Sequence, residues 1–276
     1  MIPVAVVIPE IYDRGVAHFD AGDFEQALLD FNLFLLFNPT SSQGYYVMAL
    51  SYINLEDVDN ALENLDRALA IQPIVPELEA ELHRVRAGIY GRQNELDNAL
   101  TDLSAALDLA PDADTYFRRA MVYAALEDVD NALADFDSAL ELDDSNLALY
   151  VYRAYVYSTV GDLHSAAEDY YTFVGLIESD RTEGEALESG GVQVAELAPG
   201  IVLSYPVSVK ADTYFSGIAV SADGTTPIDT LLILLDEDGV PLTADDDSGG
   251  NGIAFVQNFV IPTTGDYTVI VANSLR

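Results

Sequence analysis

The sequence contains no cysteine and no tryptophan, and Lys210 is its only lysine. The absence of cysteine excludes disulfide frameworks, thiolate metal sites and cysteine nucleophiles, although it leaves the redox compartment open. No run of about eighteen consecutive apolar residues occurs, so the sequence predicts no transmembrane helix and no membrane insertion. The amino-terminal run MIPVAVVIPE lacks a basic flank and an A-x-A site, so it is not a complete secretory signal.

Basic residues are also scarce, with 11 Lys and Arg against 47 Asp and Glu and a formal net charge of -36. Binding to nucleic acid needs concentrated Lys and Arg, so we expect no nucleic-acid partner. Abundant Asp with almost no Lys suits a protein kept soluble by its surface charge. It equally suits life in high salt, where screening relieves self-repulsion, and the sequence leaves both explanations open.

Catalytic motifs are missing as well. The sequence contains no HExxH, no GxSxG and no glycine-rich phosphate loop. Its three histidines, His18, His83 and His164, fall at different places of the repeat described next, so they predict no metal triad. The sequence therefore predicts a protein that is not an enzyme and that holds no cofactor.

The first two thirds of the chain contain a repeated pattern of small and aromatic residues. Five alanines recur at spacings of 34, 38, 33 and 34 residues: Ala27, Ala61, Ala99, Ala132 and Ala166. Another small residue precedes each by twelve positions: Gly15, Ala49, Ala87, Ala120 and Ala154. Small residues at both positions let two antiparallel helices approach closely, and an acid before each second helix can cap it. These acids are Asp23, Asp57, Glu95, Asp128 and Asp162.

This pattern resembles the tetratricopeptide repeat, and five copies cover residues 8–180. The resemblance implies an all-α right-handed superhelix of about five helix-turn-helix repeats, whose first helices line a concave groove. Four extra residues at 74–77 disturb the connection after the second repeat. The expected function is therefore a non-enzymatic scaffold for protein–protein interaction.

Four repeats carry an arginine sixteen residues before an aspartate. The pairs are Arg14 with Asp30, Arg86 with Asp102, Arg119 with Asp135, and Arg153 with Asp169. In the second repeat both positions change together, to Met48 and Asn64. We interpret each pair as a salt bridge between the two helices of one repeat, with an anion-binding row of arginines as the alternative.

The resemblance also implies which side chains face the groove. They are Tyr12, Phe19, Tyr46, Ile53, Asn54, Arg84, Arg92, Phe117, Met121 and Tyr155. Aromatic residues and arginine commonly anchor interfaces, so we expect a peptide or partner helix with apolar side chains and one acidic group. The alternative is that some of these aromatics pack only between helices. Arg84 and Arg92 stand outside the four pairs, and they are the arginines expected to contact the ligand.

After residue 180 the composition changes. Residues 181–191 are polar and glycine-bearing, which predicts a linker. Short β-rich runs separated by turn residues then predict a small all-β sandwich over residues 192–276. Its acidic turns could supply oxygen ligands to calcium, but their spacing is not that of an EF-hand, so solvated turns are favoured. These acids are Asp229, Asp236, Asp238, Asp245, Asp246 and Asp247.

The order of strands and acidic turns in residues 190–273 resembles the bacterial pre-peptidase C-terminal domain. The resemblance implies an accessory β-sandwich of exported proteins. The chain stops where that family usually continues with a further strand, so we expect the domain to be truncated. We therefore expect an exported bacterial adaptor at an extracellular or cell-surface location, with the cytoplasm as the alternative. Two rivals remain open: the accessory region of a longer secreted peptidase or other hydrolase, and a spacer without a groove ligand.

Overall fold

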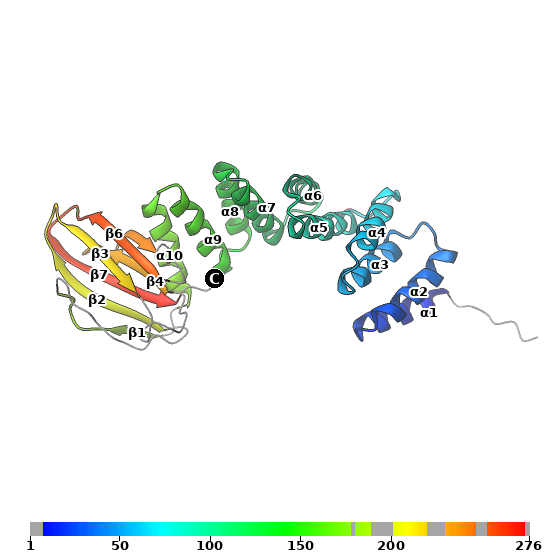
Figure 1. The fold of residues 1–276 in the computed structure, drawn as a ribbon, viewed down its shortest axis with the longest axis horizontal. Coiled ribbons are helices and arrows are strands. Elements are labelled where there is room, and N and C mark those ends of the chain that lie inside the picture. Colours follow the sequence, from blue (N-terminus) through cyan, green and yellow to red (C-terminus); the bar gives the residue numbers. More distant parts are fainter. Residues whose placement is uncertain (1–7, 178–179, 189–200, 220–229, 247–252, 274–276) are drawn as a thin grey trace, which may run out of the picture. The chain divides into compact units, whose positions relative to one another are not determined.

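A computed structural model describes residues 8–177, 180–188, 201–219, 230–246 and 253–273. The described residues form ten helices followed by seven strands (Figure 1). The helices are α1 (Ile8–Asp20), α2 (Phe24–Phe37), α3 (Ser42–Asn54), α4 (Val58–Ala70), α5 (Pro76–Arg92), α6 (Leu96–Leu109), α7 (Ala113–Ala125), α8 (Val129–Leu142), α9 (Leu147–Thr159) and α10 (Leu163–Ile177). The strands are β1 (Asp180–Glu183), β2 (Ile201–Val209), β3 (Tyr214–Ala219), β4 (Thr230–Leu235), β5 (Pro241–Asp245), β6 (Ala254–Val260) and β7 (Gly265–Asn273). The chain divides into two compact units, Met1–Asp135 and Phe136–Arg276.

Each predicted repeat is a pair of antiparallel helices, and its small residues lie at the contact between them. All five marker alanines are fully buried. At Gly15, a Cβ atom would stand 2.7 Å from the ring of Phe31, so the first pair packs too closely for any larger residue. The period of the small residues therefore sets where the two helices of each pair touch.

The turn inside each repeat uses a left-handed residue five positions before the marker alanine. Gly22 and Gly161 adopt φ angles of 79° and 78° there. Asn94, Glu56 and Glu127 hold the same conformation with φ between 59° and 60°. Glycine and asparagine tolerate this region best, so the two glutamates are the strained members of the set.

The extra residues after the second repeat lengthen a helix. Helix α5 has 17 residues, whereas α3 and α7 have 13 each. It begins at Pro76, and the fixed φ of proline suits the first position of a helix. Residues 71–75 connect it to α4, and the peptide bond between Gln72 and Pro73 is cis.

The carboxyl-terminal region contains two sheets. The larger has the strand order β1-β2-β7-β4-β5, and β3 pairs with β6 in the smaller. Strand β1 runs parallel to β2, while the other neighbours are antiparallel, so the larger sheet is mixed. The described residues thus form ten helices in a repeat array followed by a β-rich region with a mixed sheet.

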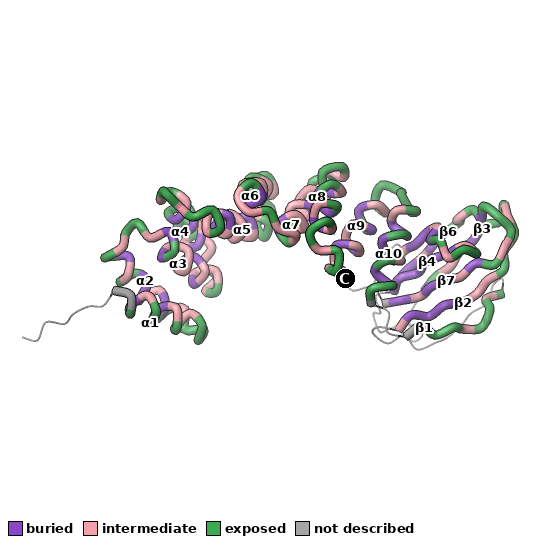
Figure 2. The backbone as a smooth tube through the Cα atoms, turned by 180° about the vertical axis from the view of Figure 1, so that it is seen from behind, coloured by how far each residue is buried: buried purple, intermediate pink, exposed green. Residues whose placement is uncertain are grey.

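Strand β4 of the larger sheet is buried on both faces, as its purple colour indicates (Figure 2). On one face Leu232 and Leu234 pack with side chains of β3 and β6. On the other face Ile233 belongs to a core with residues of α9 and α10, and α10 lies beside the sheet (Figure 1). A strand buried on both faces needs no polar alternation, which explains the continuous apolar sequence TLLILL.

The last repeat and the sheet therefore share one hydrophobic core. Phe173 and Val174 of α10 lie fully buried in it together with Ile270 of β7. The segment expected to be a linker begins instead with strand β1, because its residues pair with β2 from Asp180↔Ile201 to Glu183↔Ser204. Backbone pairing of this kind depends on a partner distant in sequence, and local composition carries no sign of it.

Candidate functional site

The four arginine–aspartate pairs are in contact in the structure. Asp102 accepts hydrogen bonds from Nε and Nη2 of Arg86 at 2.7 and 2.6 Å. Arg119 and Arg153 hold Asp135 and Asp169 by the same two nitrogens at 2.6 to 2.8 Å. Nε of Arg14 lies 2.9 Å from Asp30, and its Nη2 also binds that carboxylate. Two parallel bonds fix the guanidinium plane, so these four arginines hold helices together within their repeats.

The carboxylate of Asp102 is buried and is held by a second donor. Nδ1 of His83 lies 2.7 Å from its Oδ1 atom. Burial opposes ionisation of Asp102, but the hydrogen bonds from Arg86 and His83 outweigh it, and the pKa of this carboxyl lies below its usual value. Below that pKa the protonated acid loses the ion pair, so this contribution to stability is present at neutral pH and is lost in strong acid.

Three of these arginines also bind the preceding repeat, a contact that the sequence analysis missed. Nη1 of Arg86 donates to Asp66 at 2.6 Å, and Nη1 of Arg153 donates to Asp137 at 2.5 Å. Arg119 reaches Ser104 in the same way at 3.1 Å. The acceptors stand five residues after the marker alanines of their repeats, and this spacing is the signal that could have revealed them. The joint between the first two repeats has buried Met48 in place of an arginine.

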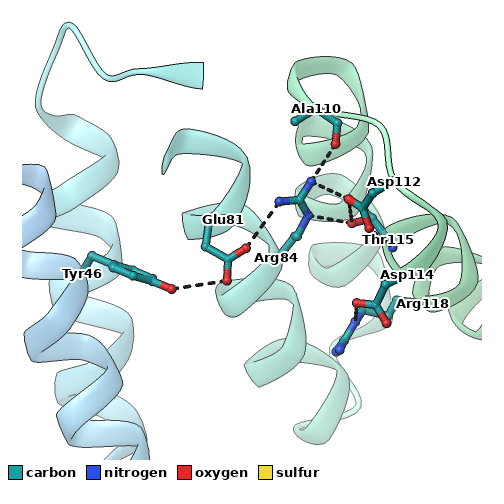
Figure 3. A network of polar contacts seen from close by, with 8 residues as sticks. All are labelled: Tyr46, Glu81, Arg84, Ala110, Asp112, Asp114, Thr115 and Arg118. Atoms are coloured by element: carbon teal, nitrogen blue, oxygen red, sulfur yellow. Dashed lines mark hydrogen bonds and ion pairs between the residues drawn. The ribbon is translucent and has the colours of Figure 1, made fainter. Parts of the chain in front are cut away.

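Arg84 was expected to face a ligand, but in the structure all three nitrogens of its guanidinium group bind other residues of the chain (Figure 3). Its Nε donates to Oγ1 of Thr115 at 2.7 Å, and its Nη2 donates to the carbonyl of Ala110 and to Asp112 at 2.6 and 2.5 Å. Nη1 reaches Glu81 at 3.4 Å. These bonds connect α5 to the start of α7, so Arg84 holds two repeats together.

Glu81 extends this network to the second repeat. The hydroxyl of Tyr46 on α3 lies 3.3 Å from Oε1 of Glu81 on α5 (Figure 3). Burial and the neighbouring carboxylate raise the pKa of Tyr46 to about 12. The phenol therefore stays neutral at physiological pH and donates to Glu81. The network runs along the first helices of the second, third and fourth repeats.

Several aromatics predicted to line the groove pack mainly within the array. Tyr12 is half-buried, and its ring centroid lies 5.8 Å from Phe31 and 5.1 Å from Phe34. Phe19 packs edge-on against Phe24 at 5.4 Å. This agrees with the alternative that such aromatics fill space between helices.

The remaining predicted groove residues differ in exposure. Ile53, Phe117 and Met121 are half-buried. Asn54 is exposed, but its side-chain amide donates to Leu50 of its own helix at 2.8 Å. Tyr155 is 45% exposed and belongs to the second unit.

One face of α5 is left open. Arg84, Gly88 and Gly91 follow one another at helical spacing, so they share a face of the helix. A Cβ atom at either glycine would meet nothing within 4 Å. Arg92 follows directly, is exposed, and is alone among the eight arginines of the described helices in making no ion pair with a described residue. This open face, defined by Gly88, Gly91 and Arg92, is the candidate binding surface.

The acidic turns give no metal cluster in the part of the chain that the structure describes. Oδ1 of Asp236 accepts the backbone N–H groups of Asp238 and Val240 at 3.0 and 2.8 Å, so this acid closes its own turn. Oδ2 of Asp245 accepts the N–H of Phe255 at 2.7 Å. Asp229 and Asp247 lie outside the described residues.

None of the helices in the described residues is long and apolar enough to span a membrane.

Comparison with protein families identifies the repeats. Residues 46–114 and 113–146 each match a model of the tetratricopeptide repeat. The mouse and rat proteins named sperm-associated antigen 1 are 34% and 33% identical to this chain over 101 residues. That stretch is 37% of this chain but only 11% of each relative's length. These matches confirm the predicted tetratricopeptide repeats within residues 46–146.

Solved structures show the same fold for the helical part. A double mutant of MamA from strain RS-1 has a TM-score of 0.57 at 19% identity, covering 61% of this chain and 93% of that protein. YrrB, described as a tetratricopeptide repeat protein with an unusual peptide-binding site, has a TM-score of 0.52 at 18% identity over 60% and 84% of the chains. PilF of Pseudomonas aeruginosa also has a TM-score of 0.52, at 18% identity over 61% and 75%. At these identities the likeness shows the fold alone.

Proposed function

We propose that this protein is a non-enzymatic scaffold whose repeat array binds a peptide or a helix of a partner protein. The observation that carries the proposal is the open face of α5. Repeats of this type are a scaffold typical of protein–protein interaction, and the fold shared with the peptide-binding YrrB supports a peptide ligand here.

Packing within the fold does not explain why glycine stands at positions 88 and 91 on the open face of α5. Glycine inside a helix costs about 1 kcal/mol relative to alanine. Gly88 and Gly91 have open space where a side chain would stand, so packing within the array does not require them. A ligand backbone that approaches α5 closely does require them, since any side chain would hold it away.

The charges around this face define the ligand further. Arg84 is engaged by Glu81, Asp112 and Thr115, so among the described groove residues Arg92 remains as the cation for a ligand. Aromatic and thioether side chains of Phe117 and Met121 on α7 are partly exposed. We therefore propose a ligand with apolar side chains and one carboxylate, which Arg92 binds.

A matched pair of charge reversals tests this proposal. A synthetic peptide library is screened on the full chain, and the selected peptide is titrated against Arg92→Glu and Arg67→Glu. Arg67 lies on α4, is 56% exposed and pairs only with Glu63 within the described residues, so its reversal changes net charge equally. We expect Arg92→Glu to weaken binding at least about tenfold and Arg67→Glu to leave it unchanged. Equal effects of both variants would refute the assignment.

For the β-rich region we propose an extracellular accessory module, which makes the whole chain an exported bacterial adaptor. Its support is the order of strands and acidic turns that resembles the pre-peptidase C-terminal domain, including the proposed sandwich. The rival proposal is the accessory region of a longer secreted peptidase or other hydrolase. The genomic sequence on both sides of the coding region distinguishes them, because the rival needs a catalytic domain in the same reading frame.

A further inference from the structure

Helix α2 exposes a row of large apolar side chains that the array does not use. Leu29, Leu33 and Leu36 are 62%, 36% and 77% exposed, and Phe37 is 51% exposed. Their spacing of four, three and one residues places them on one side of the helix. We call these four side chains the α2 stripe. The opposite side of α2 packs in the core through Ala27, Phe31 and Leu35, so the helix is apolar on both sides.

At three of the four stripe positions the other repeats show that the fold does not require leucine, whereas the position of Phe37 is apolar in every repeat. The positions equivalent to Leu29 hold Glu63, Thr101, Ala134 and Glu168. Those equivalent to Leu33 hold Arg67, Ala105, Ser138 and Thr172, and those equivalent to Leu36 hold Ala70, Asp108, Glu141 and Gly175. Five helices of the same kind thus share a framework, and the first alone carries leucine at all three positions.

Three of the four stripe residues also lie in an uncharged part of the chain, and Leu29 lies just before it. From Phe31 to Leu55 the sequence has 25 residues without a charged side chain, although the whole chain carries a net charge of -36. Asp30, just before this segment, is buried and bound to Arg14. Two copies of so acidic a protein repel each other over most of their surfaces. At the α2 stripe they can approach without bringing carboxylates together.

We propose that the α2 stripe is a self-association surface, on which α2 of a second copy packs antiparallel. A two-fold arrangement brings the same leucines from both copies together, as an isologous interface requires. A basic partner would find no carboxylate to pair with along residues 31–55, whereas a second copy presents the same uncharged segment, which favours a second copy as the occupant. The four side chains expose roughly half of the 800 Å² per partner that a standard interface buries, so the dimer is weak and reversible.

Salt dependence provides the sharpest test. Added salt screens repulsion between the acidic copies and leaves apolar contact intact, so the dimer should strengthen as salt rises. Sedimentation equilibrium of the full chain at about 0.1 M and about 2 M sodium chloride measures this, since the Debye length falls from about 10 Å to below about 3 Å over that range. We expect the dimer dissociation constant to fall at least about tenfold.

Two substitutions separate the stripe from other exposed leucines. Leu36→Glu places a charge within the proposed contact, and because Leu36 is 77% exposed we expect the monomer to fold normally. Leu142→Glu is the matched control, because Leu142 is 57% exposed on α8 and stands where Phe37 stands in the first repeat. We expect Leu36→Glu to raise the dissociation constant at least about tenfold in 2 M salt and the control to leave it unchanged. Circular dichroism melting checks that both variants remain folded.

Three results would overturn the proposal. A chain that stays monomeric in high salt would exclude a second copy and leave the stripe to a different protein. Association that weakens with salt would indicate a contact between charges elsewhere. Equal responses of Leu36→Glu and Leu142→Glu would show that general surface hydrophobicity, and not the α2 stripe, drives association.

Discussion

The second helices of the first and last repeats, α2 and α10, differ in how far their apolar side chains are buried. In the last repeat, α10 is covered by strands β4 and β5, and its Phe173 and Val174 are fully buried. In the first repeat, α2 keeps four large apolar side chains exposed. The repeat pattern that predicts both helices is the same, so what covers a helix depends on the positions around that pattern.

At two of these positions the fifth repeat has a smaller residue than the other four repeats, and both residues lie where α10 contacts the sheet. One residue after the marker alanine, the first four repeats have leucine, whereas the fifth has Ala167. Eight residues after it, leucine again gives way to Val174 in the fifth repeat. Both residues are fully buried in the core shared with the sheet. Smaller side chains let the strands approach α10 closely, as small residues do between helices.

The largest expected loss of stability comes from substitutions on the two faces of β4. Ile233→Ala and Leu234→Ala each remove a fully buried side chain and should each cost about 2–5 kcal/mol of unfolding free energy. Ile233 faces α9 and α10, and Leu234 faces the smaller sheet. Hydrogen exchange should therefore accelerate in α10 for Ile233→Ala alone. Equal protection of α10 in both variants would contradict a shared core.

A smaller effect compares the arginines of the two end repeats. Arg153 is 18% exposed and holds Asp137 and Asp169, whereas Arg14 is 57% exposed. Arg153→Met leaves the buried Asp169 uncompensated and should cost about 3 kcal/mol, with a smaller loss for Arg14→Met. Urea unfolding measures both.

The second repeat supplies the control for this prediction, because it has Met48 and Asn64 at the paired positions. Arg153→Met combined with Asp169→Asn should recover most of the lost stability, since no buried carboxylate remains. A double variant no more stable than the single one would show that the arginine contributes by packing and not by charge.

The third and smallest effect concerns the contact between α10 and the sheet. Ala167→Leu introduces the residue that the other four repeats carry, yet we expect it to destabilise the protein by about 1–3 kcal/mol through overpacking against the strands. The reverse change at the first repeat, Leu28→Ala, removes a half-buried side chain and provides the comparison. A stabilising Ala167→Leu, measured by thermal melting, would mean that the sheet does not occupy this place.

Local pattern was enough to predict the helical pairs and the arginine–aspartate partners. Residues such as Ala99 and Asp102 contact residues of their own repeat, so the period and the spacing within it predict which residues are in contact. The pairing of β1 with β2 and the packing of α10 on the sheet could not be predicted this way, because both depend on partners distant in sequence.

The candidate site shows the same limit. Arg92 and Arg84 look equivalent in the sequence, but Arg84 is occupied by Asp112 and Thr115 at the start of the next repeat. The relation between Arg84 and these residues occurs in the third repeat alone, so comparing repeats could not reveal it. The sequence does not show that the space beside Gly88 and Gly91 is empty, because this depends on the positions of the surrounding residues in the structure.

The central claim is that the open face of α5 receives a ligand, and one substitution tests it most directly. Gly88→Leu replaces glycine where a Cβ atom meets nothing within 4 Å, so it should raise the unfolding free energy by about 0.5–1 kcal/mol. The same side chain should block the peptide selected from the library and weaken its binding at least about tenfold by calorimetric titration. Higher stability together with lost binding is the predicted result. Higher stability with unchanged binding would contradict the account.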